Sequence, residues 1–254
     1  WLGAGVLTAS SAYGSAPAAN LRSEIRTKTW RSLTGWNVVA GQNDKIDFSR
    51  SASVYAGTIA PGNYATGALY AAAVLAAMVA ADGGNSYTLT YSGATYKFTI
   101  GGAANFELLG ATGANLASSC WIDLGFPLAD TASAKTHVST SAAYRSREWL
   151  ALDLGSAMAV QAGVLANHNL SSAGLATLQG NASALAGLGA TPSATLALAG
   201  DTTLRVGFFA AAQTYRYWRL LLSDVQDATG YAEVGIWFAG PYVEPTQAFD
   251  QGAQ

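Results

Sequence analysis

Two neighbouring segments with a two-residue alternation constrain the fold most strongly. Residues 86–91 place Tyr87, Leu89 and Tyr91 at every second position, and residues 95–100 repeat this pattern after a Ser-Gly-Ala sequence. Such alternation is typical of strands with one buried face, and a short connection containing glycine joins two strands into an antiparallel hairpin. We therefore predict a β-hairpin over residues 86–100.

A helix is predicted just before this hairpin. Tyr70, Val74 and Met78, together with Leu75 and Val79, recur at spacings of three and four in a run that is otherwise mostly alanine. This spacing places the larger apolar side chains on one face of a helix. The Asp-Gly-Gly sequence that follows is a helix stop signal.

Further short strands are expected on both sides of the helix and hairpin. Residues 45–48 and 54–59 precede a Pro-Gly-Asn turn, and residues 105–109 follow the hairpin. The order β-α-β-β-β predicts a small α+β domain over residues 40–143. We expect it to be inserted in a second domain formed by residues 1–39 and 144–254.

The flanking domain is expected to be a β-sandwich. Residues 2–36 and 181–200 are rich in small residues and are interpreted as loops. Short strands separated by turns are typical of sandwiches and jelly rolls. The predicted strands cover residues 148–155, 162–166, 176–180, 208–209, 215–222 and 232–238.

The flanking segments resemble the discoidin or coagulation-factor type C family of galactose-binding-like jelly rolls. The residues that carry this resemblance are Asn20-Leu21, Trp30-Arg31-Ser32, Trp149-Leu150-Ala151-Leu152-Asp153-Leu154-Gly155, Tyr217-Trp218-Arg219-Leu220 and Glu233-Val234-Gly235. In that family the Trp-Arg-Ser segment precedes the Trp-Leu-x-x-Asp-Leu-Gly strand by a few tens of residues. Here more than 100 residues intervene, and an inserted domain explains the departure. A longer loop costs only about 0.6 kcal/mol per doubling of its length. The predicted fold class is therefore mainly β, a galactose-binding-like jelly-roll β-sandwich interrupted by a small α+β domain.

The chain also resembles virion proteins of tailed bacteriophages. The sequence segments that carry this resemblance are Ile59-Ala60-Pro61-Gly62-Asn63-Tyr64, Phe98-Thr99-Ile100, Leu124-Gly125-Phe126 and Asn167-His168-Asn169-Leu170. They imply a tail protein of a phage particle, assembled in the host cytoplasm.

The low content of charged residues favours a protein that assembles with other subunits, and the net charge argues against nucleic-acid binding. Charged residues make up 11% of the 254 residues, whereas hydrophobic residues make up 50%, a fraction that alanine inflates. A surface so poor in charge lacks the repulsion that keeps monomers apart, so we expect part of it to be buried against other subunits. The formal net charge of −2 offers no basic field to a polyanion, so no nucleic-acid partner is expected.

No membrane span or secretory signal is predicted. The charge-free run 66–81 is shorter than the roughly 20 residues that a membrane helix needs, and it is mostly alanine. The chain begins at Trp1 with no basic residue before an apolar run, so no signal peptide is visible there.

Metal and redox chemistry find little support. The single cysteine, Cys120, excludes an internal disulfide, and neither His137 nor His168 lies in a spaced His/Cys cluster for zinc. The aspartates do not follow the spacing of a calcium loop; those considered are Asp44, Asp47, Asp123 and Asp130. We expect no cofactor. A structural calcium ion held by backbone carbonyls, common in galactose-binding-like sandwiches, is left open.

Candidate catalytic residues also favour structural interpretations. Asp153 has no second carboxylate at a recognisable spacing, so we expect it to accept hydrogen bonds from backbone groups or an arginine. His168 could act as a general base only with an activated nucleophile, and the sequence contains no Gly-x-Ser-x-Gly nucleophile elbow. We therefore interpret His168 as part of a polar turn. Cys120 lies among small apolar residues and is interpreted as a buried, inert thiol. We therefore predict that the protein is not an enzyme.

Five residues are the candidate contacts for a glycan or a protein partner. Family members that bind glycans or lipids use loops at one end of the sandwich, and the corresponding loops here cover residues 10–20, 167–174 and 224–231. Arg216 and Arg219 flank Tyr217-Trp218, and aromatic rings with planar guanidinium groups suit a sugar. Alternation along 215–220 argues against such a platform, because it places Trp218 and Leu220 in the core and Tyr217 with Arg219 on the outer face, so core packing is favoured. The candidates are Tyr13, Asn169, Tyr217, Arg219 and Tyr231.

Three functions follow from these features. The first is a structural or adaptor component of a phage tail that binds other virion subunits and forms homo-oligomers. The second is a virion module that binds a host-surface glycan; a change of Tyr231 or Arg219 should then abolish binding. The third, a polysaccharide hydrolase, requires two carboxylates about 5–10 Å apart, and no such pair is marked in the sequence.

Overall fold

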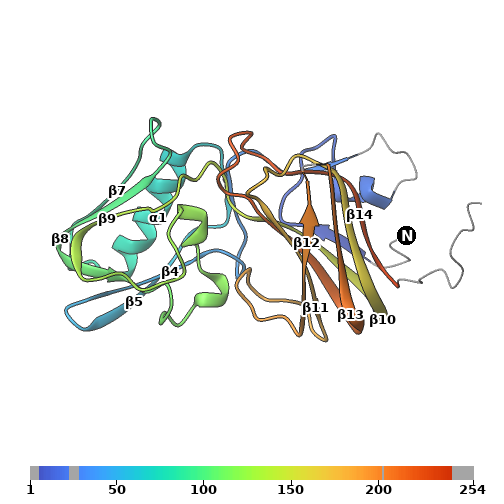
Figure 1. The fold of residues 1–254 in the computed structure, drawn as a ribbon. Coiled ribbons are helices and arrows are strands. Elements are labelled where there is room, and N and C mark those ends of the chain that lie inside the picture. Colours follow the sequence, from blue (N-terminus) through green and yellow to red (C-terminus); the bar gives the residue numbers. More distant parts are fainter. Residues whose placement is uncertain (1–5, 23–28, 202, 242–254) are drawn as a thin grey trace, which may run out of the picture.

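The computed structural model describes residues 6–22, 29–201 and 203–241. Its strands are β1 (Val6–Ala9), β2 (Trp30–Arg31), β3 (Trp36–Val38), β4 (Lys45–Arg50), β5 (Ser53–Thr58), β6 (Gly62–Tyr64), β7 (Tyr87–Tyr91), β8 (Phe98–Leu108), β9 (Ala134–Val138), β10 (Glu148–His168), β11 (Leu175–Asn181), β12 (Ala194–Gly200), β13 (Leu204–Ser223) and β14 (Glu233–Gly240). Its helices are α1 (Gly67–Ala81) and the 3₁₀ turns η1 (Ala18–Arg22), η2 (Leu116–Ser118) and η3 (Ile122–Leu124). The predicted mainly β fold class is confirmed. Figure 1 shows the β-sandwich strands on the right and the α+β unit on the left.

The sandwich is built on two long, bent strands. Residues 148–153 of β10 pair with 217–222 of β13, and residues 162–166 of β10 pair with 204–208. The register shifts between these halves, as it does where bulges bend paired strands. At one end of this pair, β10 also pairs with β1 and β13 also pairs with β11. At the other end, β10 pairs with β14 and β13 pairs with β12. Each long strand therefore takes part in both layers (Figure 1).

Apolar side chains from both layers meet inside the sandwich. Trp218 and Leu220 of β13 are fully buried, as the alternation predicts, and they share one apolar cluster with Leu165 of β10 and Trp237 of β14. Even-numbered residues of the first half of β10 point inward, so the odd-numbered ones form its outer face.

Several predicted strand boundaries were wrong. Residues 148–155 and 162–166 belong to one strand, β10, and residues 208–209 and 215–222 belong to β13. Bulges and small exposed residues interrupt the alternation although backbone pairing continues. Strand β12 lies in a segment that was predicted to be a loop. It was missed because the segment is rich in alanine, which has little intrinsic preference for strands. Likewise β1, β2 and the first residue of β3 lie in residues 2–36, which were interpreted as a loop.

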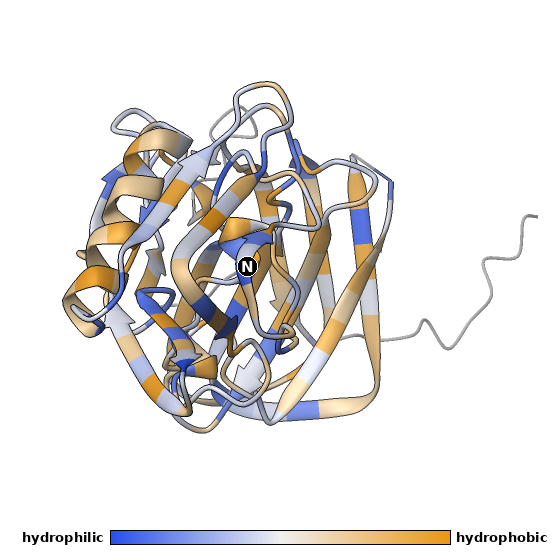
Figure 2. Cartoon of the chain, turned by 90° about the vertical axis from the view of Figure 1, so that its left-hand side faces the viewer, coloured by the Kyte–Doolittle hydropathy of each residue, from blue (hydrophilic) through white to orange (hydrophobic). Residues whose placement is uncertain are grey.

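The α+β unit packs α1 on an antiparallel sheet. The sheet has the order β5-β4-β8-β7, and β9 pairs with β8. Figure 2 shows α1 along one side of this unit, with apolar bands along the strands. Tyr70, Val74 and Met78 of α1 are fully buried as predicted, whereas Val79 is 44% exposed. The hairpin is confirmed as β7 and β8.

The end of this unit differs from the predicted order. Residues 105–109 do not form a separate strand, because β8 continues through a register shift between Gly101 and Phe106. Strand β9 was not predicted. It joins the sheet through long-range pairing that leaves no strong local pattern.

The buried apolar residues form two clusters. One spans residues 36–143, and the other combines residues 18 and 30 with residues 150–237. Trp36 of β3 belongs to the first cluster and stacks on Tyr70 with ring centroids 5.7 Å apart. The division of the chain at residues 40 and 143 stays a prediction. In the described residues, no helix is both long and apolar enough to cross a membrane.

Candidate functional site

A groove of about 350 Å³ lies on the outer face of the first half of the sandwich sheet. We call it the sheet groove. It is lined by Val6, Thr8, Gln42, Trp149, Ala151, Leu152, Asp153, Ala184, Leu185, Tyr217, Trp218 and Arg219. Its volume falls in the range typical of small-molecule sites, about 300–1,000 Å³.

Strand register places the functional side chains of this groove. Trp149, Ala151 and Asp153 alternate with inward-facing leucines on β10, so all three share the outer face. Ala151 pairs with Arg219 and Asp153 pairs with Tyr217 on the neighbouring strand β13. Trp149 and Tyr217 therefore lie at opposite ends of the floor, about 13 Å apart along the strands, with the small Ala151 between them.

The wall of the sheet groove comes from distant segments. Gln42 of the α+β unit donates from Nε2 to the Leu185 carbonyl at 3.5 Å, and the amide of Leu188 donates to the Gln42 carbonyl at 2.9 Å. Gly187 has a φ of 88° and packs against the Ala117 backbone, where a side chain would collide. The loop formed by residues 182–190 is thus held between the two units and borders the floor.

Two polar atoms at this groove have no hydrogen-bond partner. Arg219 donates from Nε to Gln179 Oε1 and from Nη1 to the Gly187 carbonyl, each at 2.9 Å. Its Nη2, and Nε1 of Trp149, are buried without a partner in the described residues. Burial, and next the positive charge of Arg147, lower the pKa of Arg219 to about 10. Residues that line the groove therefore carry aromatic rings and two buried donors without a partner.

The carboxylate of the groove is already paired. Arg216 donates from Nε and Nη2 to the two carboxylate oxygens of Asp153 at 2.7 and 2.8 Å, and the amide of Gly155 donates at 2.8 Å. These hydrogen bonds, the arginine's first, lower the pKa of Asp153 to about 2. The hydrogen bonds predicted for Asp153, from an arginine and a backbone amide, are confirmed.

Four of the five predicted contact residues form two groups. Tyr217 and Arg219 line the sheet groove, and Arg219 faces outward as the alternation predicts. It is nevertheless only 3% exposed, because Gln179 and the 182–190 loop cover it. Tyr13 and Tyr231 instead flank Arg31, whose guanidinium lies 5.1 Å and 3.7 Å from their ring centroids.

The Arg31 group borders a second depression of about 320 Å³. Tyr13, Asn20, Arg31 and Glu233 are among its lining residues. Cation–π stacking already occupies the guanidinium face of Arg31. The role of Tyr13 and Tyr231 as ligand contacts stays a prediction.

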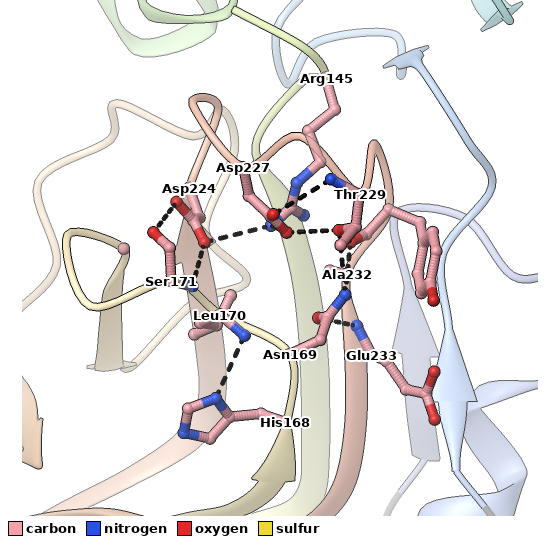
Figure 3. A network of polar contacts seen from close by, with 12 residues as sticks. Arg145, His168, Asn169, Leu170, Ser171, Asp224, Asp227, Thr229, Ala232 and Glu233 are labelled. Carbon is pink, nitrogen blue, oxygen red and sulfur yellow. Dashed lines mark hydrogen bonds and ion pairs between the residues drawn. The ribbon is translucent and has the colours of Figure 1, made fainter. Parts of the chain in front are cut away.

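Asn169 uses its amide within the protein. Its Nδ2 donates to the Tyr231 carbonyl at 2.9 Å and to Thr229 Oγ1 at 3.2 Å, and its Oδ1 accepts from the Glu233 amide at 2.7 Å. Figure 3 shows it in a polar network that ties the 167–174 and 224–231 loops together. A ligand would compete with these hydrogen bonds. The predicted contact of Asn169 with a ligand is not tested.

Arg145 lies at the centre of the same network (Figure 3). It is 1% exposed, and its Nη2 lies 3.6 Å from Asp224 Oδ2 and 3.7 Å from Asp227 Oδ2. Asp224 also accepts from the amide and hydroxyl of Ser171 at 2.7 and 2.8 Å. The loops expected to carry a ligand are therefore bound to the chain that leaves the α+β unit.

His168 and Cys120, the other residues considered for catalysis, are engaged or buried within the protein. His168 Nδ1 accepts from the Leu170 amide at 3.2 Å, and Cys120 is fully buried. Burial raises the pKa of the Cys120 thiol well above its usual range. Within the described residues, no group of three or more His, Cys, Asp or Glu side chains could hold a metal ion.

Trp149, Gln42 and Leu185 line the site but were not predicted to do so from the sequence. Trp149 was assigned only to the strand motif that resembles the discoidin family. Its alternation with Leu150 and Leu152 already places it outward, so this signal was present. Gln42 and Leu185 carried no such signal, because their position depends on how two distant segments meet.

No protein-family model matches the chain, and a comparison with curated proteins also produces no match. Similar solved structures include the family 32 carbohydrate-binding module from C. perfringens NanJ in complex with galactose, with 8% identity, 92% of each chain covered and a TM-score of 0.38. Chitosan-binding module 1 from the chitosanase/glucanase of Paenibacillus sp. IK-5 has 20% identity, 40% of this chain and 74% of that chain covered, and a TM-score of 0.29. Module 2 of that enzyme has 18% identity, 38% and 78% coverage, and a TM-score of 0.27. At such TM-scores the similarity carries no information about ligand or activity.

Proposed function

We propose that the protein is a glycan-binding module that holds its ligand in the sheet groove. The observation that carries this proposal is the combination of Trp149 and Tyr217 at the two ends of one floor with unpartnered donors between and beside them. Aromatic rings pack on the apolar faces of sugar rings, and planar guanidinium groups bind oxygen acceptors. Their separation of about 13 Å suits a ligand of more than one sugar unit.

The chemistry of the groove favours binding over hydrolysis. Glycoside hydrolysis uses two carboxylates about 5–10 Å apart, one of them able to donate a proton. Asp153 is the carboxylate that lines the sheet groove, and Arg216 holds it ionised. A carboxylate so paired serves to orient hydroxyl groups by accepting their hydrogen bonds.

A glycan array followed by isothermal titration calorimetry tests this proposal. We expect saturable binding of at least one oligosaccharide, and a loss of at least about tenfold in affinity for Trp149→Ala and for Tyr217→Ala. Tyr13→Ala is the control, because Tyr13 is an exposed tyrosine that lies outside the groove. Binding that is lost in the Tyr13 variant and kept in both groove variants would move the site to the Arg31 group and contradict the proposal.

A second candidate function is self-association through the other half of the sandwich sheet. Its outer face carries two rows of uncharged apolar residues across β12, β13, β10 and β14. The first row is Ala199, Val206, Val164 and Phe238, and the second is Leu204, Ala166 and Ile236. Leu204 is 47% and Ile236 38% exposed. A contiguous apolar face of this kind is typical of an interaction surface, and a twofold dimer would pair it with itself.

This candidate agrees with the subunit role in a phage tail predicted from the sequence, which no comparison tests. Sedimentation velocity provides the measurement. We expect the protein to associate with rising concentration and Ile236→Asp to make it monomeric. Val54→Asp is the control, because Val54 is an exposed valine of the α+β unit. A wild-type protein that stays monomeric at high micromolar concentration would exclude self-association through this face.

A further inference from the structure

One buried cation of the sheet groove lacks a counter-charge. Arg145 and Arg147 are also almost fully buried, and both face carboxylates within ion-pair distance. Arg219 instead faces the Gln179 amide and the Gly187 carbonyl. Among the described residues, no carboxylate lies within ion-pair distance of Arg219. Asp153, which lines the same groove, is paired with Arg216.

A buried guanidinium without an anion is unfavourable. Removing the charge from water is costly, and two neutral acceptors offset this cost only in part. The depressed pKa of Arg219 reports the same cost. An anion that enters the groove would accept the free N–H of Nη2 in surroundings of low dielectric, where charge-assisted hydrogen bonds are strong.

Arg205 shows that an unpaired buried arginine alone does not indicate a ligand. Its guanidinium donates to the carbonyls of Gly174 and Ser171, and it lines neither the sheet groove nor the depression beside Arg31. Arg219 differs because it lines a groove between two aromatic side chains. The unsatisfied charge and the space for a ligand coincide there.

We infer that the ligand of the sheet groove is an acidic oligosaccharide, with a sugar carboxylate paired to Arg219 and neighbouring rings packed on Trp149 and Tyr217. This inference rests on the proposed glycan-binding function and narrows it to a ligand class. One carboxylate matches one unpaired guanidinium. A polyanion such as a nucleic acid would place further charges beside Asp153, which lines the same groove.

Titration calorimetry with two matched pairs of probes tests the inference. The probes are trigalacturonate and a hyaluronan tetrasaccharide, each compared with its fully methyl-esterified form, which has the same rings without the charge. We expect at least one acid to bind at least about tenfold more tightly than its ester. Arg219→Gln should remove this difference between acid and ester, because it removes the positive charge that pairs with the sugar carboxylate. Arg50→Gln is the matched control, because Arg50 pairs with Asp82 in the α+β unit.

A second measurement covers the case in which Arg219→Gln does not fold. In the wild-type protein, the ¹⁵N-¹H signal of Arg219 Nε should shift with the acid and stay in place with the ester. Equal affinity for acid and ester overturns the acidic-ligand inference, as does binding of neutral glycans alone. If Trp149→Ala still weakens those neutral ligands, the proposed glycan-binding function stands. No binding of any glycan on the array would overturn both.

Discussion

Arg147 donates from Nε to Asp123 Oδ1 at 2.9 Å, and this ion pair joins the residue before β10 to η3 of the α+β unit. Arg147 is 4% exposed and Asp123 is fully buried. The backbone amide of Arg147 donates to the same oxygen, and Asn43 Nδ2 donates to Asp123 Oδ2, each at 2.9 Å. The pair therefore connects three segments that are far apart in the sequence.

Removing one partner of this pair should destabilise the protein strongly. Arg147→Met leaves Asp123 as an uncompensated buried charge, which typically costs about 3–5 kcal/mol. We expect this loss in the free energy of unfolding measured with urea. Arg216→Met, which breaks the more exposed pair with Asp153, should have a much smaller effect. Equal losses in the two variants would show that the Arg147 pair contributes nothing through its burial.

Glu148 should make stability depend on pH near neutrality. Burial raises its pKa to about 7, although Ser10, Asn37 and Ser11 donate hydrogen bonds to it. Between pH 4.5 and 7 the folded state keeps a proton that the unfolded state loses, so stability falls as pH rises through this window. The total effect corresponds to about 3 kcal/mol.

Glu148→Gln mimics the protonated acid and should flatten this part of the profile. Urea unfolding at a series of pH values is the measurement, and the variant should be more stable than the wild type at pH 8. Glu107→Gln is the control, because Glu107 is a partly buried glutamate that accepts a hydrogen bond from Ser49. A wild-type profile that stays flat between pH 5 and 7 would contradict the role of Glu148.

The predicted domain division can be tested by deletion. Removing residues 40–143 and joining the ends with a short Gly-Ser linker should leave a folded sandwich, because its apolar cluster contains no residue of that range. The deletion should carry Arg147→Met and Trp36→Ser, since it removes Asp123 and the packing around Trp36. We expect cooperative thermal unfolding by circular dichroism. The same protein should bind glycans more weakly, because Gln42 is lost from the sheet groove.

The domain boundary and the contribution of the α+β unit to the sheet groove would be contradicted by different results. An insoluble product, or one without a cooperative transition, would contradict the boundary. A folded product with wild-type glycan affinity would show that the α+β unit does not contribute to the groove.

Cys120 should be unreactive in the folded protein. It is fully buried, and burial raises the pKa of its thiol, so the reactive thiolate is scarce. We expect no reaction with a thiol reagent under native conditions and one equivalent of reaction in denaturant, since the chain has one cysteine. Rapid native labelling would show that the surrounding cluster opens.

Local sequence patterns were sufficient to predict whether many segments form a strand or a helix and which of their faces is buried. Alternation predicted the β7–β8 hairpin and the inward position of Trp218, because side chains of a strand point alternately to its two faces. Spacings of three and four predicted the buried face of α1 for the same kind of reason. The mainly β class and the outward position of Arg219 followed from residues close in sequence.

The tertiary structure alone decided which outward residues meet and which of them are covered. Trp149 and Tyr217 share a floor because β10 and β13 pair in one register, and a shift of one residue would turn each side chain to the opposite face. Arg219 is buried because the loop of residues 182–190 covers it, and this loop is held by Gln42 and by the close packing of Gly187 on the Ala117 backbone. The continuity of β10 and the strand β12 likewise depend on pairing between distant segments. Register, bulges and covering loops arise from contacts between residues far apart in the chain, so the local sequence determined the faces of the strands, and the packed structure determined the site.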